Sequence, residues 1–197
     1  MNDIFGFSSN DVFMGGSGVV GHFDGLRWSA VELPRAYEVK SLWGSAPNDV
    51  YAVSRNRIYH FDGESWTELQ TSLRSDVRWE SICGFGAESI FVAGRNSESP
   101  WDGALAEFDG SVWREIEIPT GSTLWDCYSP SPGRVVTVGS DARILHYDRG
   151  SLSQMFVSFD SAFQTVWGTS PSEIFAGGAG GMFRFDGEHW TRMPDIP

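Results

Sequence analysis

The sequence Phe61-Asp62-Gly63-Glu64-Ser65-Trp66 decides the fold, because the chain repeats this phrase along its length. Phe-Asp-Gly recurs at positions 23–25, 108–110 and 185–187, and a degenerate copy, Tyr147-Asp148-Arg149, stands between the last two. In all four Phe-Asp-Gly copies a Trp follows three positions after the Gly: Trp28, Trp66, Trp113 and Trp190. A period near 40 residues in a chain of 197 predicts a tandem-repeat architecture rather than a domain of unique parts.

The second copy shows the repeat most clearly. Its β-branched and aromatic residues fall into four short runs, at 39–45, 50–53, 58–61 and 66–69, each closed by Pro, Asn, Asp or Gly or by the next connection. This pattern predicts a four-stranded antiparallel meander. The Asp-Gly step supplies a hairpin turn, since Gly tolerates positive φ and Asp can bond its own backbone. Helical periodicity is nowhere sustained over about ten residues, so we expect very little helix.

A four-stranded unit of about 40 residues, repeated in tandem, is typical of a β-propeller blade. The segment Trp43-Gly44-Ser45-Ala46-Pro47-Asn48-Asp49-Val50, with His60-Phe61-Asp62-Gly63, also resembles the propeller repeats of bacterial, often extracellular, proteins. The resemblance covers the entire chain and implies the fold, not a function, because such repeats occur in proteins with many roles. We predict an all-β, five-bladed β-propeller in one domain, residues 1–197, with blades at about 1–36, 37–72, 73–119, 120–158 and 159–197.

The phase of the repeats bears on whether the ring closes. The chain opens inside the first strand of copy one and stops just after the fourth strand of copy five, so each blade is complete within its own sequence. We expect a closed ring in which blade one packs against blade five. The alternative is five consecutive blades of a larger ring, which would need a second chain or would stay open and self-associate through exposed apolar faces.

Composition limits the partners. The chain carries 26 acidic against 14 basic residues, a formal net charge of −12. Binding to nucleic acid depends on Lys and Arg neutralising phosphates, so we expect no nucleic-acid partner. The absence of a run of about 18 apolar residues predicts no membrane insertion. Nothing at the N-terminus reads as a signal peptide, so we expect a cytoplasmic protein unless the chain is excised from a longer secreted parent. The only cysteines, Cys83 and Cys127, are expected to be buried thiols.

The repeated polar and aromatic residues have structural interpretations. The Asp residues of the turns could suggest calcium, but each turn offers one carboxylate, so we expect turn-forming Asp and no metal or cofactor. The repeated Trp residues are expected to pack between blades rather than stack on sugars. His22, His60 and His146 share one strand position, whose equivalents are Glu107 and Arg184, and are expected to be a tolerated polar site.

The sequence contains no nucleophile elbow, phosphate loop or Cys/His pairing with a known spacing, so we predict that the protein is not an enzyme. A less favoured alternative is a glycosidase-like enzyme with carboxylates on the innermost strands. Its candidate residues would be Asp3, Glu80 and Asp126.

The best functional lead is the copy that departs from the pattern. The spacing between the repeated Asp residues is 38, 47, 39 and 38, so copy three carries an insertion, within residues 95–103, and a slightly lengthened connection before it, within 71–78. Both should emerge on one face, where loops of neighbouring blades bring further Arg residues. The predicted ligand- or partner-binding residues are Trp79, Arg95, Trp101, Asp102, Arg55, Arg57 and Arg143.

We therefore expect a non-catalytic binding module that recognises a glycan or a protein through this loop face. A lectin should use several equivalent sites, whereas a protein-interaction module should use one. A scaffold, or a piece of a larger propeller that associates with itself, is the alternative.

Overall fold

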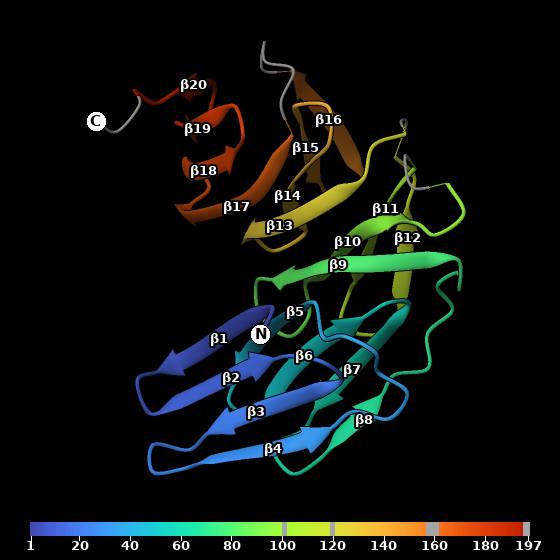
Figure 1. The fold of residues 1–197 in the computed structure, drawn as a ribbon. Coiled ribbons are helices and arrows are strands. Elements are labelled where there is room, and N and C mark those ends of the chain that lie inside the picture. The colour runs from blue at the N-terminus through green and yellow to red at the C-terminus, as the bar shows by residue number, and fades with distance from the viewer. Residues whose placement is uncertain (100–101, 119–120, 157–161, 195–197) are drawn as a thin grey trace.

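The protein is built from five four-stranded antiparallel sheets that follow one another along an arc, as Figure 1 shows for a computed structural model. The structure describes residues 1–99, 102–118, 121–156 and 162–194. Every strand pairs with its neighbour in sequence, so each sheet is a meander formed by one repeat. The described residues contain no helix, and therefore none that could cross a membrane. The prediction of an all-β protein with five blades is confirmed.

The first blade comprises β1 (Asp3–Ser8), β2 (Asp11–Gly15), β3 (Val19–Phe23) and β4 (Trp28–Glu32). The second comprises β5 (Ser41–Ala46), β6 (Asp49–Ser54), β7 (Arg57–Phe61) and β8 (Trp66–Glu68). The third comprises β9 (Val77–Gly84), β10 (Ile90–Asn96), β11 (Gly103–Phe108) and β12 (Trp113–Ile116). The fourth comprises β13 (Leu124–Ser131), β14 (Arg134–Gly139), β15 (Arg143–Asp148) and β16 (Ser151–Phe156). The fifth comprises β17 (Phe163–Ser170), β18 (Glu173–Gly178), β19 (Gly181–Phe185) and β20 (Trp190–Arg192).

The repeated Asp-Gly step forms the turn between the third and fourth strands. In the second blade, Asp62 Oδ1 accepts hydrogen bonds from the backbone N–H groups of Glu64 and Ser65, at 2.9 and 2.8 Å, and Gly63 has a φ of +96°. The same two bonds recur at Asp24, Asp109 and Asp186. These bonds stabilise the carboxylate and lower the pKa of Asp62. The turn-forming interpretation is confirmed.

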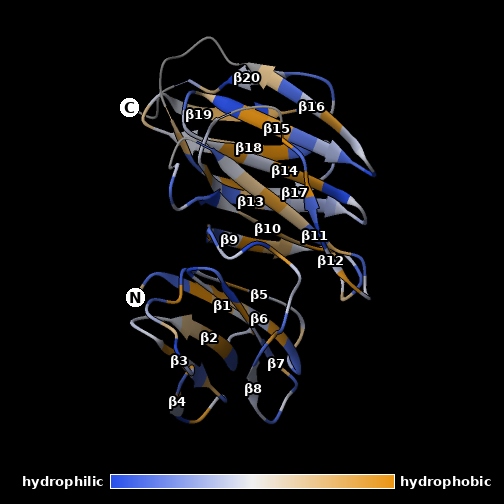
Figure 2. Cartoon of the chain, turned by 90° about the vertical axis from the view of Figure 1, so that its right-hand side faces the viewer, coloured by the Kyte–Doolittle hydropathy of each residue, from blue (hydrophilic) through white to orange (hydrophobic). Residues whose placement is uncertain are grey.

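Each pair of neighbouring blades shares one hydrophobic cluster. We call the side of a blade that meets the next blade its front face and the opposite side its rear face. Between blades two and three, Tyr51, Val53 and Ile58 on the front face meet a rear face that includes Ile90, Val92 and Trp113. Three further clusters join the other neighbours in the same way, and Figure 2 shows the hydrophobic residues concentrated in the strands. The core is therefore divided among four interfaces between blades.

The repeated Trp residues belong to the rear faces. Trp66 packs beside Phe61, with ring centroids 5.4 Å apart, and meets Phe13 of the first blade at 6.4 Å. Trp190 packs beside Phe185 and donates a hydrogen bond to His146 of the fourth blade at 3.1 Å. The interpretation of these rings as packing residues is confirmed for Trp66, Trp113 and Trp190, each of which meets a preceding blade.

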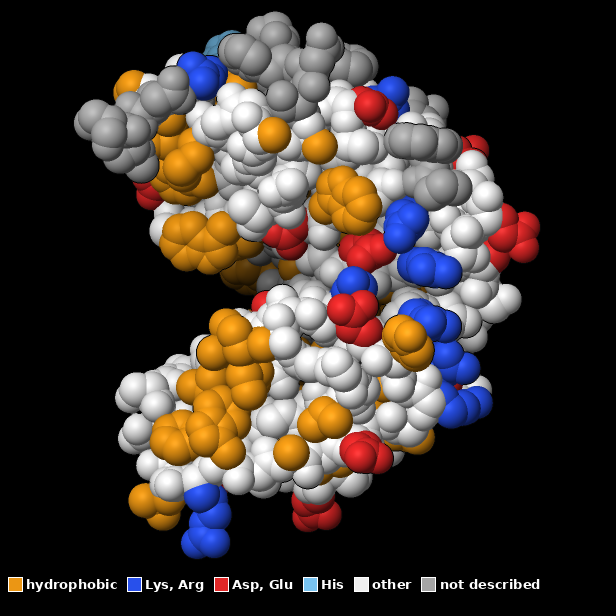
Figure 3. Space-filling model, in the orientation of Figure 1, with side chains coloured by type: hydrophobic (Ala, Val, Ile, Leu, Met, Phe, Trp, Pro, Cys, Tyr) orange, Lys and Arg blue, Asp and Glu red, His pale blue; other side chains and the backbone are white. Residues whose placement is uncertain are grey.

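The expectation of a closed ring is wrong for this structure. The first and fifth blades stand apart, and the space-filling view shows an open arc with its opening between them (Figure 3). Among the residues that the structure describes, the main contacts between blades join consecutive blades, from β1 against β5 to β13 against β17. The spacing that the four interfaces impose brings five blades only part of the way round a circle.

A second correction concerns the cysteines. Cys83 of β9 and Cys127 of β13 form a disulfide, with Cα atoms 5.9 Å apart, instead of remaining free thiols. The two residues are 44 positions apart and stand on the inner strands of adjacent blades. The sequence could not reveal the pairing, because the two positions are not equivalent in their repeats and approach each other only when the blades pack.

Candidate functional site

The insertion of the third blade lies against the connection that precedes this blade. Ser97 donates its backbone N–H to the carbonyl oxygen of Asp76 at 2.6 Å, and Asn96 Nδ2 donates to Asp76 Oδ2 at 3.0 Å. Within the insertion, Asn96 Oδ1 accepts hydrogen bonds from the N–H groups of Glu98 and Ser99. The prediction that the two enlarged segments are neighbours is confirmed. A cavity of about 540 Å³ borders them, lined in part by Arg74, Asn96, Asp102 and Glu115.

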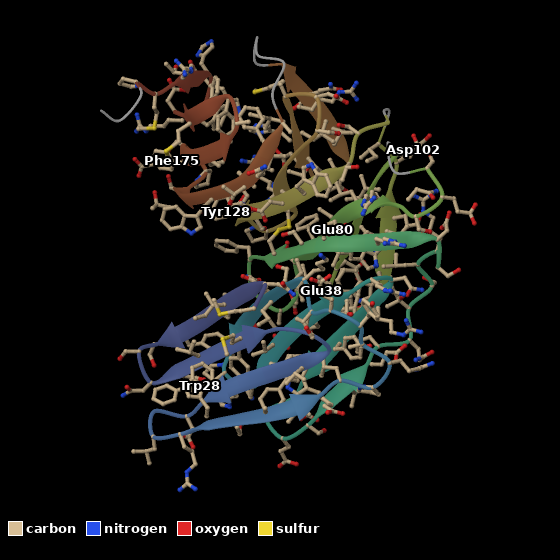
Figure 4. All side chains as sticks on the ribbon, viewed as in Figure 1. Trp28, Glu38, Glu80, Asp102, Tyr128 and Phe175 are labelled. Atoms are coloured by element: carbon tan, nitrogen blue, oxygen red, sulfur yellow. A yellow bond between two sulfur atoms is a disulfide. The ribbon has the colours of Figure 1, made fainter. Side chains whose placement is uncertain are left out.

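One predicted residue of this region does not lie where it was expected. Trp79 was expected near the surface, but it is only 1% exposed and belongs to the cluster between blades two and three. Its position in β9 directs the ring inward, so it supports the loops from beneath. Trp101 lies outside the described residues. Asp102 is exposed at the end of the insertion and is labelled in Figure 4.

A basic and aromatic surface lies next to the insertion, across blades two to four. The guanidinium of Arg55 stacks over the ring of Tyr37, 4.0 Å from its centroid. Arg95 lies 5.8 Å from the ring centroid of Trp125 and its Nε is 3.1 Å from Glu80 Oε1. We call this surface the arginine face. It comprises Tyr37, Lys40, Arg55, Arg78, Arg95 and Trp125.

A pocket of about 120 Å³ opens in the arginine face, lined by all of these residues except Trp125 and also by Glu38, Trp79 and Glu80. Figure 3 shows Lys and Arg side chains gathered on this side of the molecule, and Figure 4 marks Glu38 and Glu80. Glu38 pairs with Lys40 at 2.9 Å. Arg55 and Arg78 make no ion pair among the described residues. Four cations and two carboxylates leave the surface locally positive on an acidic protein.

The other two predicted arginines lie elsewhere. Arg57 Nε is 3.3 Å from Glu68 Oε1, and Arg35 binds the same carboxylate at 2.7 Å, so this trio joins the connection after blade one to the outer edge of blade two. Arg143 begins β15, and its Nε and Nη1 are buried without a hydrogen-bond partner among the described residues. Equivalence in the repeat therefore did not bring these side chains to the surface that Arg55 and Arg95 form.

Sequence reasoning missed Tyr37, Lys40, Arg78 and Trp125. Lys40 and Trp125 occupy the same repeat position, at the entry to the inner strand, where the other blades carry Asn2, Glu80 and Gln164. The ends of inner strands meet near the centre of one face of a propeller. Aligning this position would have found two of the missed residues, whereas Tyr37 stands in an irregular connection.

Two of the three inner-strand carboxylates, Asp126 and Asp3, join neighbouring blades. Asp126 of blade four accepts hydrogen bonds from Ser81 Oγ of blade three at 2.8 Å and from Thr165 Oγ1 and Val166 N of blade five at 3.0 and 2.9 Å. Burial raises the pKa of Asp126, while these donors oppose the rise. Asp3 likewise accepts the N–H of Leu42 in blade two at 2.7 Å. The third carboxylate, Glu80, pairs with Arg95 of its own blade at 3.1 Å.

The described residues contain no group of three or more His, Cys, Asp or Glu side chains that could hold a metal ion. His22 and His60 instead bond Asp11 and Asp49 of their own blades, each at 2.7 Å. The polar side chains at this repeated strand position therefore form hydrogen bonds with partners in their own blade or in the next one.

Comparison with known proteins supports the fold. The WD40 β-propeller domain of Doa1 superposes on 94% of this chain with a TM-score of 0.74 and 13% identity. Virginiamycin B lyase from Staphylococcus aureus matches 98% of the chain with a TM-score of 0.76 and 12% identity. YCF48 from Cyanidioschyzon merolae matches 92% with a TM-score of 0.70 and 15% identity. At these identities the likeness shows that the chain has the β-propeller fold.

No family model matches the sequence. A curated protein, the immune protein Tsi7 of Pseudomonas aeruginosa strain PAO1, is 27% identical in a match that covers 59% of this chain and 49% of that protein. The chain therefore matches about half the length of this relative. The structural matches cover 64% of the Doa1 chain, 65% of YCF48 and 70% of the lyase.

Proposed function

We propose that this propeller is a non-catalytic protein-binding module that engages an acidic segment of a partner protein through the arginine face. The observation that carries the proposal is the pair of Arg–aromatic contacts, Arg55 on Tyr37 and Arg95 beside Trp125. Arg78 lines the same pocket and makes no ion pair with any residue that the structure describes. Arg, Tyr and Trp are the residue types that dominate binding energy at protein interfaces. Arginines already ordered by an aromatic ring lose less side-chain entropy when a carboxylate binds.

Two features favour a protein over a glycan. The exposed aromatic residues of the arginine face are not repeated around the arc, since Asn2, Lys40, Glu80 and Gln164 stand where the fourth blade has Trp125. The repeated Trp residues, which could have formed several equivalent sugar platforms, are engaged in packing at the internal interfaces. A single charged site is typical of a protein interface, whereas a repeated propeller lectin would show several similar sites.

The similarity to a protein named immune protein points to the biological role. Colicin DNases and their immunity proteins, for example, form some of the tightest protein complexes known. We propose that this chain binds and neutralises a protein partner in the same manner. Virginiamycin B lyase has a similar fold and is named as an enzyme. Two of the three inner carboxylates here, Asp3 and Asp126, are instead engaged between blades, which favours binding over catalysis.

The test uses the partner protein captured by the wild-type chain from its source cells, then purified. The Kd should rise at least about 100-fold for Arg55→Ala combined with Arg78→Ala, since each hot-spot residue contributes about 2 kcal/mol or more and 100-fold corresponds to about 2.8 kcal/mol. Trp125→Ala should raise it about tenfold or more. Raising the salt concentration should weaken wild-type binding and have less effect on the double variant.

The matched control is Arg27→Ala, which removes an equally exposed arginine from a turn on the first blade. It should leave the Kd within about twofold of the wild-type value. If the double variant binds as tightly as the control, the arginine face is not the site. A glycan array with several strong signals would favour the lectin alternative.

A further inference from the structure

The two ends of the arc expose the kind of surface that every internal interface buries. On the rear face of the first blade, Ile4 is 57% exposed, whereas its equivalents Leu42, Ile82, Cys127 and Val166 are between 3% and 5% exposed. On the front face of the fifth blade, Met182 is 45% exposed, whereas Val20, Ile58, Leu105 and Ile144 at the same position do not exceed 2%. Trp28 and Trp167 are also exposed, by 51% and 61%. The difference arises from the missing neighbour, because the residue types are alike.

Each end face carries half of a recurring contact. At the internal interfaces, the rear face of a blade contributes a Phe–Trp pair, or a Tyr in the fourth blade. These rings meet an aromatic or aliphatic residue and a polar residue on the front face of the preceding blade. Trp190 on His146 and Tyr147 on Glu107 are examples, with hydrogen bonds of 3.1 Å in both cases. The first blade presents the rear-face pair, Phe23 and Trp28, with ring centroids 5.4 Å apart. The fifth blade presents the front-face residues, Phe175 opposite Arg184.

Figure 4 places Trp28 and Phe175 on the two sides of the opening, and Figure 3 shows hydrophobic side chains along both. The first blade exposes a rear face and the fifth blade exposes a front face. A further run of blades would end in one front face and one rear face, so it could pack against both. The contact would be head-to-tail, as at each internal interface.

The lengths of similar propellers indicate how many further blades would complete the ring. The five blades superpose almost completely on the propellers of Doa1 and virginiamycin B lyase but cover only 64% and 70% of those chains. The remaining third of such a chain is the length of about two blades of roughly 40 residues. A second copy would bring five blades, and head-to-tail association of copies without closure would produce open chains.

We propose that the two end faces are docking surfaces for a two-blade segment of the same repeat, which completes a larger closed ring. The incoming segment must offer a front face with an aliphatic residue at the Ile58 position for Ile4 and Trp28. It must also offer a rear face with a Phe-Asp-Gly-x-x-Trp hairpin for Met182 and Arg184.

The experiment compares the 197-residue chain with an extended chain in which residues 1–72, the first two blades, are repeated after residue 197. We expect the 197-residue chain to bind an apolar-surface dye and to self-associate as its concentration rises. The extended chain should be monomeric, with dye fluorescence reduced severalfold. A control extension carries Asp at the copied Val20 and Ile58 positions, which cannot pack, and should keep the high fluorescence.

Two results would overturn the proposal. One is an extended chain that binds as much dye as the control extension. The other is a 197-residue chain that does not bind the dye. It could be a monomer, or a discrete dimer that Met182→Glu dissociates. The dimer would mean that a second copy covers the end faces. These measurements need no protein partner, so they are independent of the proposed binding function.

Discussion

Two parts of the molecule with the same residue pattern have opposite surroundings. At the internal interfaces, side chains such as Ile82 and Trp113 are buried by the neighbouring blade, while at the ends of the arc their equivalents, Ile4 and Trp28, face solvent. The repeat prescribes an apolar residue at each position, but burial depends on whether another blade is present. Stability should therefore be concentrated at the four internal interfaces, and the following predictions test that contrast.

The largest effect should come from the matched Trp residues. Trp113→Ala removes a buried ring from the interface between blades two and three and should cost about 3–5 kcal/mol of unfolding free energy. Trp28→Ala removes an equivalent ring from an end face and should cost less than about 1 kcal/mol. Urea denaturation of both variants measures the difference. Equal losses would show that the rear face of the first blade is covered in solution.

The disulfide between blades three and four should have the next largest effect. Replacing Cys127 by Ser, with Cys83→Ser to avoid a free thiol, opens a loop of 44 residues and should cost about 2–4 kcal/mol. Thiol titration of the denatured, unreduced wild-type protein should find no free cysteine. Two reactive thiols would contradict the crosslink, and the double Ser variant would then be close to the wild type in stability.

Acid should weaken the interface between blades four and five. Burial lowers the pKa of His146 to about 4, and its Nε2 must be unprotonated to accept the hydrogen bond from Trp190. The unfolded chain therefore binds more protons between about pH 6.5 and pH 4, so stability should fall by about 2–3 kcal/mol as the pH is lowered through this window.

His146→Phe should remove most of that acid dependence, whereas His189→Gln, in an exposed turn of the same interface region, should leave it intact. Unfolding curves at a series of pH values provide the measurement. An unchanged slope in His146→Phe would assign the acid sensitivity to other groups.

The smallest effect on stability should be at the arginine face. Arg55 and Arg78 make no ion pair among the residues described, so replacing both by Ala should change the unfolding free energy by no more than about 0.5 kcal/mol. A loss of partner affinity in this variant would then reflect the surface and not the fold. A loss of several kcal/mol would show that the arginines support the blade interface instead.

The repeat made most of the fold predictable. Asp62-Gly63 and its copies identified the hairpins, and the runs around them identified the strands, because turn chemistry and strand pattern are local. Ring closure was not predictable, since it depends on the angle between blades. The disulfide was missed for a similar reason, because Cys83 and Cys127 occupy different repeat positions on adjacent blades.

The candidate site was predicted in part. Arg55 and Arg95 lie on one surface, as expected from their equivalent loops, and the insertion bonds the connection at Asp76. Trp79 was predicted to bind a ligand or partner beside the enlarged loops, yet its place in β9 buries it. Tyr37 and Trp125 joined the site through contacts between blades, which no local pattern records.

By itself, the sequence determined the blade: its four strands, its Asp-Gly turn and its apolar positions follow from short-range backbone and side-chain preferences. The tertiary structure alone decided which of the apolar positions are buried, which cysteines pair, and which arginines share a surface. These properties depend on how one blade packs on the next, and that geometry involves residues about 40 positions apart.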